Sequence, residues 1–266
     1  MAPWGSPETL LERFSRQTPN GQGRWGQIQG ISCPETADCI VVLDTLGIKS
    51  LPPNSRNKKI IHLRREPDLV NQFCPLQNSH FMDYSAGTFH VATWWISHTY
   101  DELINLPYFA KDCLVSTVVS AKWEHRNRFF KKLCSFLDID AYGGVGIKEF
   151  VNSSYKRAVT PFKNKEDGIK NYRYSIALEN SAQHNYFTEK IIDCLLLWTI
   201  PIYWGCPNIS QFFPEHSYYN ISLDNPQEVS DIIKRPIEKR NIEAMRESRA
   251  LILNKYNIWA VIKSLL

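Results

Sequence analysis

One continuous segment, residues 172–213, restricts the fold of this chain more than any other stretch. It reads YRYSIALENSAQHNYFTEKIIDCLLLWTIPIYWGCPNISQFF. The pattern is that of an apolar strand, a polar loop, the start of a helix, an apolar helix and a second apolar strand. Polar and ionisable side chains gather at residues 179–190, directly after the first strand. Ligands of open α/β sheets bind at the carboxyl ends of the strands, so the segment predicts a parallel sheet with a binding site at its edge.

The composition is that of a folded protein with a mild positive charge. Of the 266 residues, 43% are hydrophobic and 12% are aromatic, which suits a well-filled core. The net charge of +4 comes from basic residues that are interleaved with acids. Nucleic-acid binders concentrate Lys and Arg on one face or in one run, so we expect no nucleic-acid partner.

The cysteines and the apolar runs indicate in which cellular compartment the protein is expected to reside. The seven cysteines form no CxxC pair, and none is paired with a histidine at zinc-ligand spacing, so we expect reduced thiols and no metal centre. No basic-then-apolar leader is visible. The longest apolar stretch, residues 191–206, is interrupted by Asp193 and Pro201 and is too short to cross a bilayer. We therefore expect a soluble, cytoplasmic protein without a transmembrane segment.

Strand and helix patterns alternate along the chain, which predicts parallel sheets covered by helices. We expect strands at residues 39–43, 58–67, 114–120, 175–178 and 201–204, and helices at 124–137, 189–198, 226–233, 237–254 and 258–266. A first helix is predicted with Ser6 as its cap and Pro7 at its first position. Residues 140–146 are expected to form a glycine-rich turn. A proline-containing loop near residues 105–108 predicts two domains, 1–107 and 108–266.

Several side chains near the predicted helix starts are candidates for holding an anion. The helix capped by Thr188 carries Lys190 in its first turn, where the helix dipole disfavours a cation unless an anion such as pyrophosphate binds there. Glu189 can accept two ribose hydroxyls, and Tyr186 can pack on a base or a sugar. Arg126, at the start of an earlier helix, can clamp a phosphate. Taken one at a time, each of these residues also fits an ordinary solvated helix end.

Glu66 is the candidate general base. It lies in the sequence RREP, at the carboxyl end of a predicted strand in the first half of the chain. A carboxylate that faces a cleft between two domains can take a proton from a substrate. Arg64 and Arg65 would tend to keep it ionised. The alternative is that Arg64, Arg65 and Glu66 form an ordinary ion pair on the protein surface. The histidines lack a Ser, Asp or Cys partner at a motif spacing, and we interpret them as surface or satisfied groups.

The segment ALENSAQHNYFTEKIIDCLLLWTIPIYWGCPNI resembles the signature of the α-1,3/1,4-fucosyltransferase family. The family pattern is Phe/Leu-Glu-Asn-Ser, a spacer, Tyr-x-Thr-Glu-Lys, an apolar helix, and Pro followed by two hydrophobic residues, any residue and Gly. Residues 178–181, 186–190 and 201–205 match these parts. The resemblance extends through VVSAKWEHRNRFFKKL, DIDAYGG and SYYNISL, covers residues 111–235, and is greatest to soluble bacterial members.

This resemblance implies an α/β fold of the GT-B type, in which two Rossmann-like domains face a cleft. A small or truncated N-terminal domain, 1–107, would serve the acceptor, and the C-terminal domain, 108–266, would hold GDP-fucose. The implied reaction moves L-fucose to a hydroxyl of an oligosaccharide or glycolipid, expected to contain N-acetylglucosamine, in α-1,3 or α-1,4 linkage with inversion. No metal ion would be obligatory, and a divalent ion would at most stimulate.

The matched motif also implies roles for individual side chains. Donor contacts would come from six residues: Arg126, Glu179, Asn180, Tyr186, Glu189 and Lys190. Glu179 and Asn180 would shape the sugar pocket. Lys190 and Arg126 would offset the charge that builds on the departing GDP. Glu66 would deprotonate the acceptor hydroxyl.

Two departures from the family pattern concern the first half of the chain. Family members place an acid near a Glu-Ser-Pro element, whereas this chain has Arg64-Arg65-Glu66-Pro67, with one acid. The chain starts at MAPWG, where relatives have a strand before Trp-Gly, and we hypothesise that the first strand is missing. Two alternatives stay open: a GT-B transferase that uses another nucleotide sugar, and a protein that binds a GDP-sugar without turnover.

Overall fold

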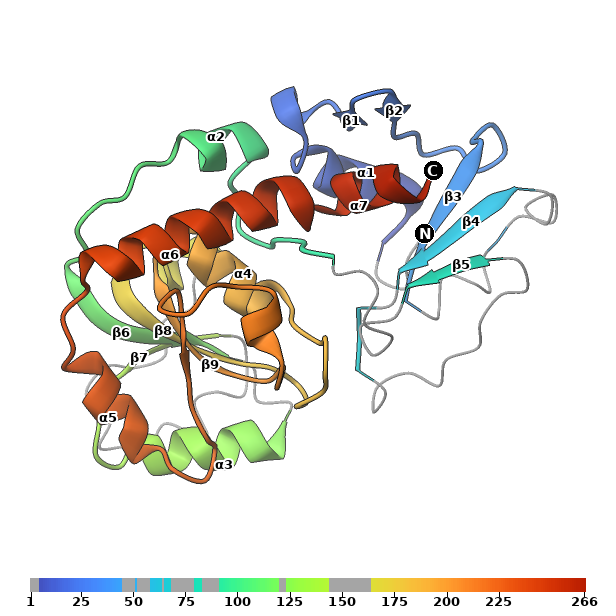
Figure 1. Ribbon diagram of the computed structural model, residues 1–266. Coiled ribbons are helices and arrows are strands. Elements are labelled where there is room, and N and C mark those ends of the chain that lie inside the picture. The colour runs from blue at the N-terminus through green and yellow to red at the C-terminus, as the bar shows by residue number, and fades with distance from the viewer. Residues whose placement is uncertain are drawn as a thin grey trace.

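The structure is a computed structural model and describes residues 5–44, 51, 58–63, 65–67, 79–82, 91–119, 123–143 and 164–266. The described residues form two α/β lobes (Figure 1). We call the larger one, with the five-stranded sheet and helices α3 to α6, the C-terminal lobe. The N-terminal lobe contains a three-stranded sheet.

A five-stranded parallel sheet forms the core of the C-terminal lobe, with the strand order β10-β9-β8-β6-β7. Its strands are β6 (Cys113–Val118), β7 (Asp140–Tyr142), β8 (Tyr172–Leu178), β9 (Ile200–Trp204) and β10 (Tyr219–Asn220). The chain passes outward from β6 to β7 and then returns to place β8 on the other side of β6. The strand order therefore reverses between β6 and β8, and in open parallel sheets such a reversal is where ligands bind.

Four helices cover this sheet: α3 (Glu124–Leu133), α4 (Glu189–Leu196), α5 (Gln227–Ile233) and α6 (Lys239–Ala250). In Figure 1, α4 and α6 lie together on one side of the sheet, and α3 and α5 lie below it. Residues 191–196 of α4 are all buried, which explains why the sequence of this helix is apolar almost all round. The predicted parallel sheet covered by helices is confirmed.

Two local predictions in this lobe are wrong. Residues 140–142, expected to begin a turn, form β7, which pairs with residues 116–118 of β6. The glycines that follow suggested a turn, whereas the alternate burial of Ile139 and Ala141 is the period of a strand. The helix predicted to reach residue 137 ends at Leu133, and the chain continues in turns. Phe136 lies in these turns and is 44% exposed.

The N-terminal lobe is built on a parallel sheet in the order β3-β4-β5. Its strands are β3 (Cys39–Leu43), β4 (Lys59–Leu63) and β5 (Ser79–Met82), and a short hairpin of β1 (Arg24–Trp25) and β2 (Ile28–Gln29) precedes them. Helix α1 (Pro7–Ser15) begins as predicted, because the side chain of Ser6 accepts a hydrogen bond from the backbone N–H of Thr9. The strand predicted at residues 39–43 is confirmed.

The last helix returns to the first lobe. Helix α6 continues through a π-helical turn, Leu251–Lys255, into α7 (Ile258–Leu265), and Figure 1 shows α6 and α7 running across both lobes. The indole N–H of Trp259 donates to the carbonyl of Phe14 at 2.8 Å, and α7 joins α1, β3 and β4 in one apolar cluster. Helix α2 (Tyr100–Asn105) lies in the connection before β6. The domain boundary at residue 107 stays a prediction.

Within the described ranges, no helix has the length and apolar character that crossing a bilayer requires.

Candidate functional site

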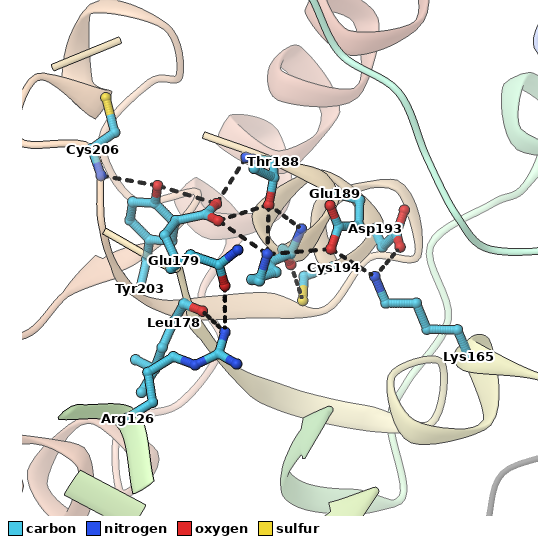
Figure 2. A network of polar contacts seen from close by, with 12 residues as sticks. Arg126, Lys165, Leu178, Glu179, Thr188, Glu189, Asp193, Cys194, Tyr203 and Cys206 are labelled. Atoms are coloured by element: carbon cyan, nitrogen blue, oxygen red, sulfur yellow. Dashed lines mark hydrogen bonds and ion pairs between the residues drawn. The ribbon is translucent and has the colours of Figure 1, made fainter. Parts of the chain in front are cut away.

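Glu179 fixes the start of α4 at the carboxyl end of β8. Its side chain is fully buried and directly follows the strand. The backbone N–H of Thr188 donates to Oε1 of Glu179 at 2.8 Å, and the Thr188 hydroxyl donates to Oε2 at 2.7 Å (Figure 2). Thr188 is the N-cap of α4, as predicted, and accepts from the N–H of Lys190. The carboxylate thus ties the tip of the helix to the end of the central strand.

Space for Glu179 depends on Gly205, the residue after β9. A Cβ atom added to Gly205 would overlap the side-chain carbons of Glu179 and would lie 2.7 Å from the hydroxyl of Tyr203. Both neighbours are fully buried, so neither can move aside cheaply. Gly205 is the last residue of the sequence pattern matched at residues 201–205, and its role here is therefore one of packing.

We predict that Gly205→Ala destabilises the fold by about 1–3 kcal/mol, because the added methyl group overpacks a buried site. Denaturant unfolding measures the loss as a lower midpoint. Ser210→Ala, at an exposed position of the nearby 3₁₀ turn, is the control and should change stability by less than about 0.5 kcal/mol. Equal midpoints for Gly205→Ala and the parent protein would contradict the packing argument.

Lys190 lies in the first turn of α4 and is held by two carboxylates. Its Nζ is 3.3 Å from Oε2 of Glu179, 3.3 Å from Oε1 of Glu189, and 3.0 Å from the Thr188 hydroxyl. Burial opposes its charge, but the attraction of Glu189 and Glu179 outweighs burial and raises the pKa of Lys190. The ammonium group is therefore charged at neutral pH.

Arg126 reaches the same point from α3, the helix after β6. It is only 3% exposed, so the alternative of a solvated helix arginine is wrong. Its Nη1 donates to the carbonyl of Leu178 at 3.1 Å and to Oδ1 of Asn180 at 3.0 Å, across the reversal in strand order (Figure 2). Glu189 and Glu179 keep the pKa of Lys190 raised although the positive charge of Arg126 acts in the opposite direction.

The structure adds Lys165 and Asp193, which sequence reasoning missed. Lys165, in a 3₁₀ turn before β8, lies 2.7 Å from Oδ2 of Asp193 and 3.8 Å from Oε1 of Glu189. Burial favours a protonated Glu189, but Lys190 and Lys165 overcome it and lower the pKa of Glu189 to about 2. An acid within the apolar run IIDCLLLW was a signal for Asp193. Lys165 carried no such signal.

Asn180 and Tyr186 lie close to Arg126 in different ways. Asn180 is half-buried and accepts the hydrogen bond from Arg126 described above. Tyr186 is only 1% exposed, and its hydroxyl acts electrostatically on Arg126, so its ring lies beneath the surface of the site. This position fits support of the arginine better than stacking on a base. The proposed ligand contacts of both residues stay predictions.

Glu66 comes to the site from the N-terminal lobe, three residues after the end of β4. Burial, followed by repulsion from Asp44, raises the pKa of its carboxyl group, while Lys190 lowers it. Because both Lys190 and Glu189 act on its charge, Glu66 lies within electrostatic reach of the first turn of α4. The two lobes therefore bring the predicted base and the predicted donor residues together.

The expectation that neighbouring arginines keep Glu66 ionised needs correction. Arg65 pairs with Asp44 instead, with Nη2 to Oδ2 at 2.8 Å and its backbone N–H to Oδ1 at 2.9 Å. Arg65 does lower the pKa of Glu66, but burial and Asp44 outweigh it. Arg64 lies outside the described residues. Glu66 is therefore a carboxylate with a raised pKa, which suits a proton acceptor better than a permanently ionised group.

In the part of the chain that the structure describes, no three His, Cys, Asp or Glu side chains gather in a way that can hold a metal ion.

Comparison with known sequences gives consistent matches to fucosyltransferases. The profile of glycosyltransferase family 10 (fucosyltransferase) C-term matches residues 108–240, half of the chain. An α-(1,3)-fucosyltransferase of Helicobacter pylori is 33% identical over 110 residues, which cover 41% of this chain and 21% of that protein. An α-(1,4)-fucosyltransferase of Arabidopsis thaliana is 28% identical over 141 residues, which cover 48% and 35%. The chain thus spans about a third or less of the length of these relatives.

Comparison with solved structures extends over nearly the whole chain. The crystal structure of an α1,3-fucosyltransferase with GDP-fucose superposes with a TM-score of 0.52 at 20% identity, covering 96% of this chain and 80% of that one. A further α1,3-fucosyltransferase crystal structure gives 0.51 at 18% identity, covering 96% and 81%. At this level of identity the similarity shows the fold, and the expected two-lobed GT-B architecture is confirmed.

Proposed function

This chain belongs to glycosyltransferase family 10, the fucosyltransferases, and on that premise we propose that it transfers L-fucose from GDP-fucose to a hydroxyl group of a glycan. The proposed acceptor is an oligosaccharide or glycolipid that contains N-acetylglucosamine, and the new linkage is α-1,3 or α-1,4, with inversion. One observation carries the proposal. The buried guanidinium of Arg126 and the partly buried ammonium group of Lys190 both bind groups at the carboxyl end of β8, where the strand order reverses, and both residues belong to segments that match the family.

The proposed donor site uses the tip of α4. The first N–H groups of a helix and its dipole attract anions, and Lys190 adds a full charge at that end. Arg126 supplies a second cation from the neighbouring strand end. A diphosphate between these residues would be bound by charge-assisted hydrogen bonds. The hydrogen bonds from Thr188 to Glu179 hold this arrangement before the ligand arrives.

The proposed reaction is a single displacement at the anomeric carbon of fucose. The acceptor oxygen forms a bond to that carbon while the bond from the carbon to the diphosphate oxygen breaks. Glu66 accepts the proton of the attacking hydroxyl, and the GDP leaves with the electron pair. Lys190 and Arg126 stabilise the charge that develops on the departing diphosphate, which lowers the barrier more than it stabilises the bound donor.

Reaction conditions follow from the same proposal. We propose a cytoplasmic protein, because the seven cysteines of the sequence form no CxxC pair and suit a reducing compartment. Lys190 and Arg126 take the part that a metal ion plays in other transferases, so we propose that a divalent ion at most stimulates the reaction. Assays therefore include a reductant and compare EDTA with added Mg²⁺ or Mn²⁺.

The experiment that tests the function offers the protein GDP-fucose together with a panel of glycans. N-Acetyllactosamine and its type 1 isomer present the 3- and 4-hydroxyls of N-acetylglucosamine, and lactose serves as an acceptor without that sugar. We expect a fucosylated product whose linkage NMR assigns as α-1,3 or α-1,4. Transfer from UDP-glucose or GDP-mannose but not from GDP-fucose would favour the alternative of a different nucleotide sugar. Tight GDP binding with no transfer would favour a binding protein.

We predict that Glu189→Ala weakens the binding of GDP more than the binding of pyrophosphate. Glu189 is ionised and is fixed between Lys190 and Lys165, which leaves it placed to accept ribose hydroxyls. Each lost hydrogen bond to a charged group is worth about 1.5–3 kcal/mol. Titration calorimetry with the two ligands measures the difference. Equal losses for GDP and pyrophosphate would exclude the ribose contact and would indicate that Glu189 acts only through its neighbouring lysines.

A further inference from the structure

Residues 91–99, which we call the connecting segment, lie between β5 of the N-terminal lobe and α2, and they pass from one core to the other. Val91 belongs to the apolar cluster of the N-terminal lobe, whereas Trp94 and Ile96 belong to the core of the C-terminal lobe. Because Trp94 and Ile96 are buried, Trp95 between them points the other way and is 40% exposed. The position of this segment therefore depends on both lobes.

Two carboxylates of the C-terminal lobe hold the backbone of the connecting segment. The N–H of Trp95 donates to Oδ1 of Asp193, in α4, at 3.0 Å. Two residues further on, the N–H of Ser97 donates to Oε2 of Glu166 at 3.2 Å. Asp193 is fully buried and Glu166 is 7% exposed, and hydrogen bonds to ionised acceptors are stronger than those to neutral ones. The segment is thus fixed to the lobe that carries the proposed donor site.

Lys165 fixes the orientation of the Asp193 carboxylate. Its Nζ lies 2.7 Å from Oδ2 of Asp193 and 3.8 Å from Oε1 of Glu189 (Figure 2). Because the ammonium group holds Oδ2, Oδ1 is directed to the amide of Trp95. A buried carboxylate requires such a partner for its charge. One lysine therefore connects Asp193 to Glu189, the proposed ribose contact at the first position of α4.

On its other side, the connecting segment holds the end of α1. The guanidinium of Arg13 lies 4.1 Å from the centre of the Trp95 ring, which is within the range of a cation–π contact. The N–H of Tyr100, directly after the segment, donates to the carbonyl of Arg16, the C-cap of α1, at 2.8 Å. Trp95 thus binds α4 through its backbone and α1 through its ring.

Helix α1 connects this contact to the candidate general base. Phe14 of α1 packs in one apolar cluster with Leu43, at the end of β3, and Leu63, at the end of β4. Glu66 follows the end of β4 by three residues. Because protein cores are close-packed, a displacement of one element moves the elements that pack on it. A shift of α1 would therefore displace Glu66 relative to the donor residues.

We propose that Asp193 is a positioning residue for the transfer reaction. Through the connecting segment and α1, it fixes the N-terminal lobe relative to the first turn of α4, so that Glu66 faces the bound donor. This role explains why a carboxylate is kept within the apolar sequence of α4, where its burial is costly. The inference rests on the proposed function, because it concerns how the general base of that reaction is placed.

Asp193→Ala should lower kcat for fucose transfer by about tenfold to a hundredfold, because a displacement of about 1 Å between reacting groups has an effect of that size. The affinity for GDP should change much less, since Arg126 and Lys190 are kept. Asn241→Ala is the matched control, because Asn241 is 2% exposed and its side chain donates to the carbonyl of His216 within the C-terminal lobe. This control should lower the melting temperature and keep kcat. Equal losses of kcat in both variants would show that Asp193 only stabilises the fold.

Hydrogen exchange provides a readout that does not depend on activity. In Asp193→Ala the backbone amide of Trp95 loses its acceptor and should exchange at least about tenfold faster than in the parent protein. The amide of Tyr100, which donates to α1, should also exchange faster, because the contact between the segment and α1 is loosened. NMR measures both rates. Unchanged exchange at Tyr100, with or without a change at Trp95, would overturn the proposal.

A second variant covers the case in which Asp193→Ala does not fold. Asp193→Asn combined with Lys165→Met keeps an oxygen that can accept from Trp95 and leaves no ammonium group without its partner. The proposal requires slow exchange at Tyr100 and kcat at saturating GDP-fucose to be kept together or lost together, and either one without the other would overturn it. If the parent protein transfers no fucose, the proposed function falls, while exchange at Tyr100 still decides whether Asp193 fixes the two lobes.

Discussion

Glu66→Gln should reduce the rate of fucose transfer by about a hundredfold to ten-thousandfold, the usual contribution of a positioned general base. Glutamine keeps the size of the side chain and cannot accept the proton. Because Glu66 lies on the acceptor side, the affinity for GDP should change little. Steady-state kinetics with GDP-fucose and N-acetyllactosamine, together with titration of GDP, measure the two quantities. Glu35→Gln, an exposed glutamate of the same lobe, is the control.

The pH profile gives this prediction a second readout. A base works when it is deprotonated, so kcat/KM should fall as the pH drops through the pKa of Glu66. Burial and Asp44 raise that pKa, so the fall should occur at a higher pH than for an exposed glutamate. Asp193 is the second carboxyl group near the site with a raised pKa, which burial moves to about 6. If Glu66 is the base, Asp193→Asn keeps the acidic limb and Glu66→Gln loses it. An unchanged profile in Glu66→Gln would remove this residue from the mechanism.

The strength of the local pattern explains why the C-terminal lobe was predictable. Residues 172–213 combine a strand, a polar loop, a helix cap, a helix and a second strand, and within these elements local propensity and burial favour the same structure. Thr188 as a cap and Glu189 as the first residue of α4 follow from the sequence alone. The position of Arg126 beside Leu178 did not follow in the same way. It depends on the strand order β8-β6, which is a property of the whole sheet.

Ionisable pairs formed by distant segments were harder to predict from the sequence than the elements of the C-terminal lobe. Lys165 precedes β8 by seven residues, and Asp193 lies within α4, so nothing local connects them. The same holds for the pair of Arg65 with Asp44, since burial and the Asp44 carboxylate outweigh the effect of that arginine on the pKa of Glu66. Charge patterning in sequence identifies neighbours on one helix, whereas these pairs arise from packing between elements. A polar residue inside an apolar run, as with Asp193, was the one usable sign.

The other large expected effect concerns the cations of the donor site. Lys190→Ala and Arg126→Ala should each weaken GDP binding by about 1.5–3 kcal/mol, or about tenfold to more than a hundredfold in Kd, because each removes a charge-assisted contact with the diphosphate. Titration calorimetry measures the change. Lys234→Ala, an exposed lysine whose only partner in a described ion pair is Asp231, is the control and should bind GDP as the parent protein does.

The surroundings of Lys190 complicate the interpretation of the single variant Lys190→Ala. Glu179 is fully buried and forms its ion pair with Lys190, so removing the ammonium group leaves an uncompensated carboxylate in the core. Breaking one side of a buried pair costs about 3–5 kcal/mol, so Lys190→Ala should also lower the melting temperature. Weak GDP binding by this variant alone would therefore not separate a lost contact from a loosened site.

A paired variant makes that separation. Glu179→Gln combined with Lys190→Met removes both charges and leaves a side chain that can still accept a hydrogen bond from Thr188. We expect this double variant to recover most of the stability that Lys190→Ala loses, since no buried charge is left alone. If Lys190 binds the diphosphate, the recovered fold should still bind GDP at least about tenfold more weakly than the parent protein. Recovery of stability and GDP affinity together would show that Lys190 serves only to neutralise Glu179.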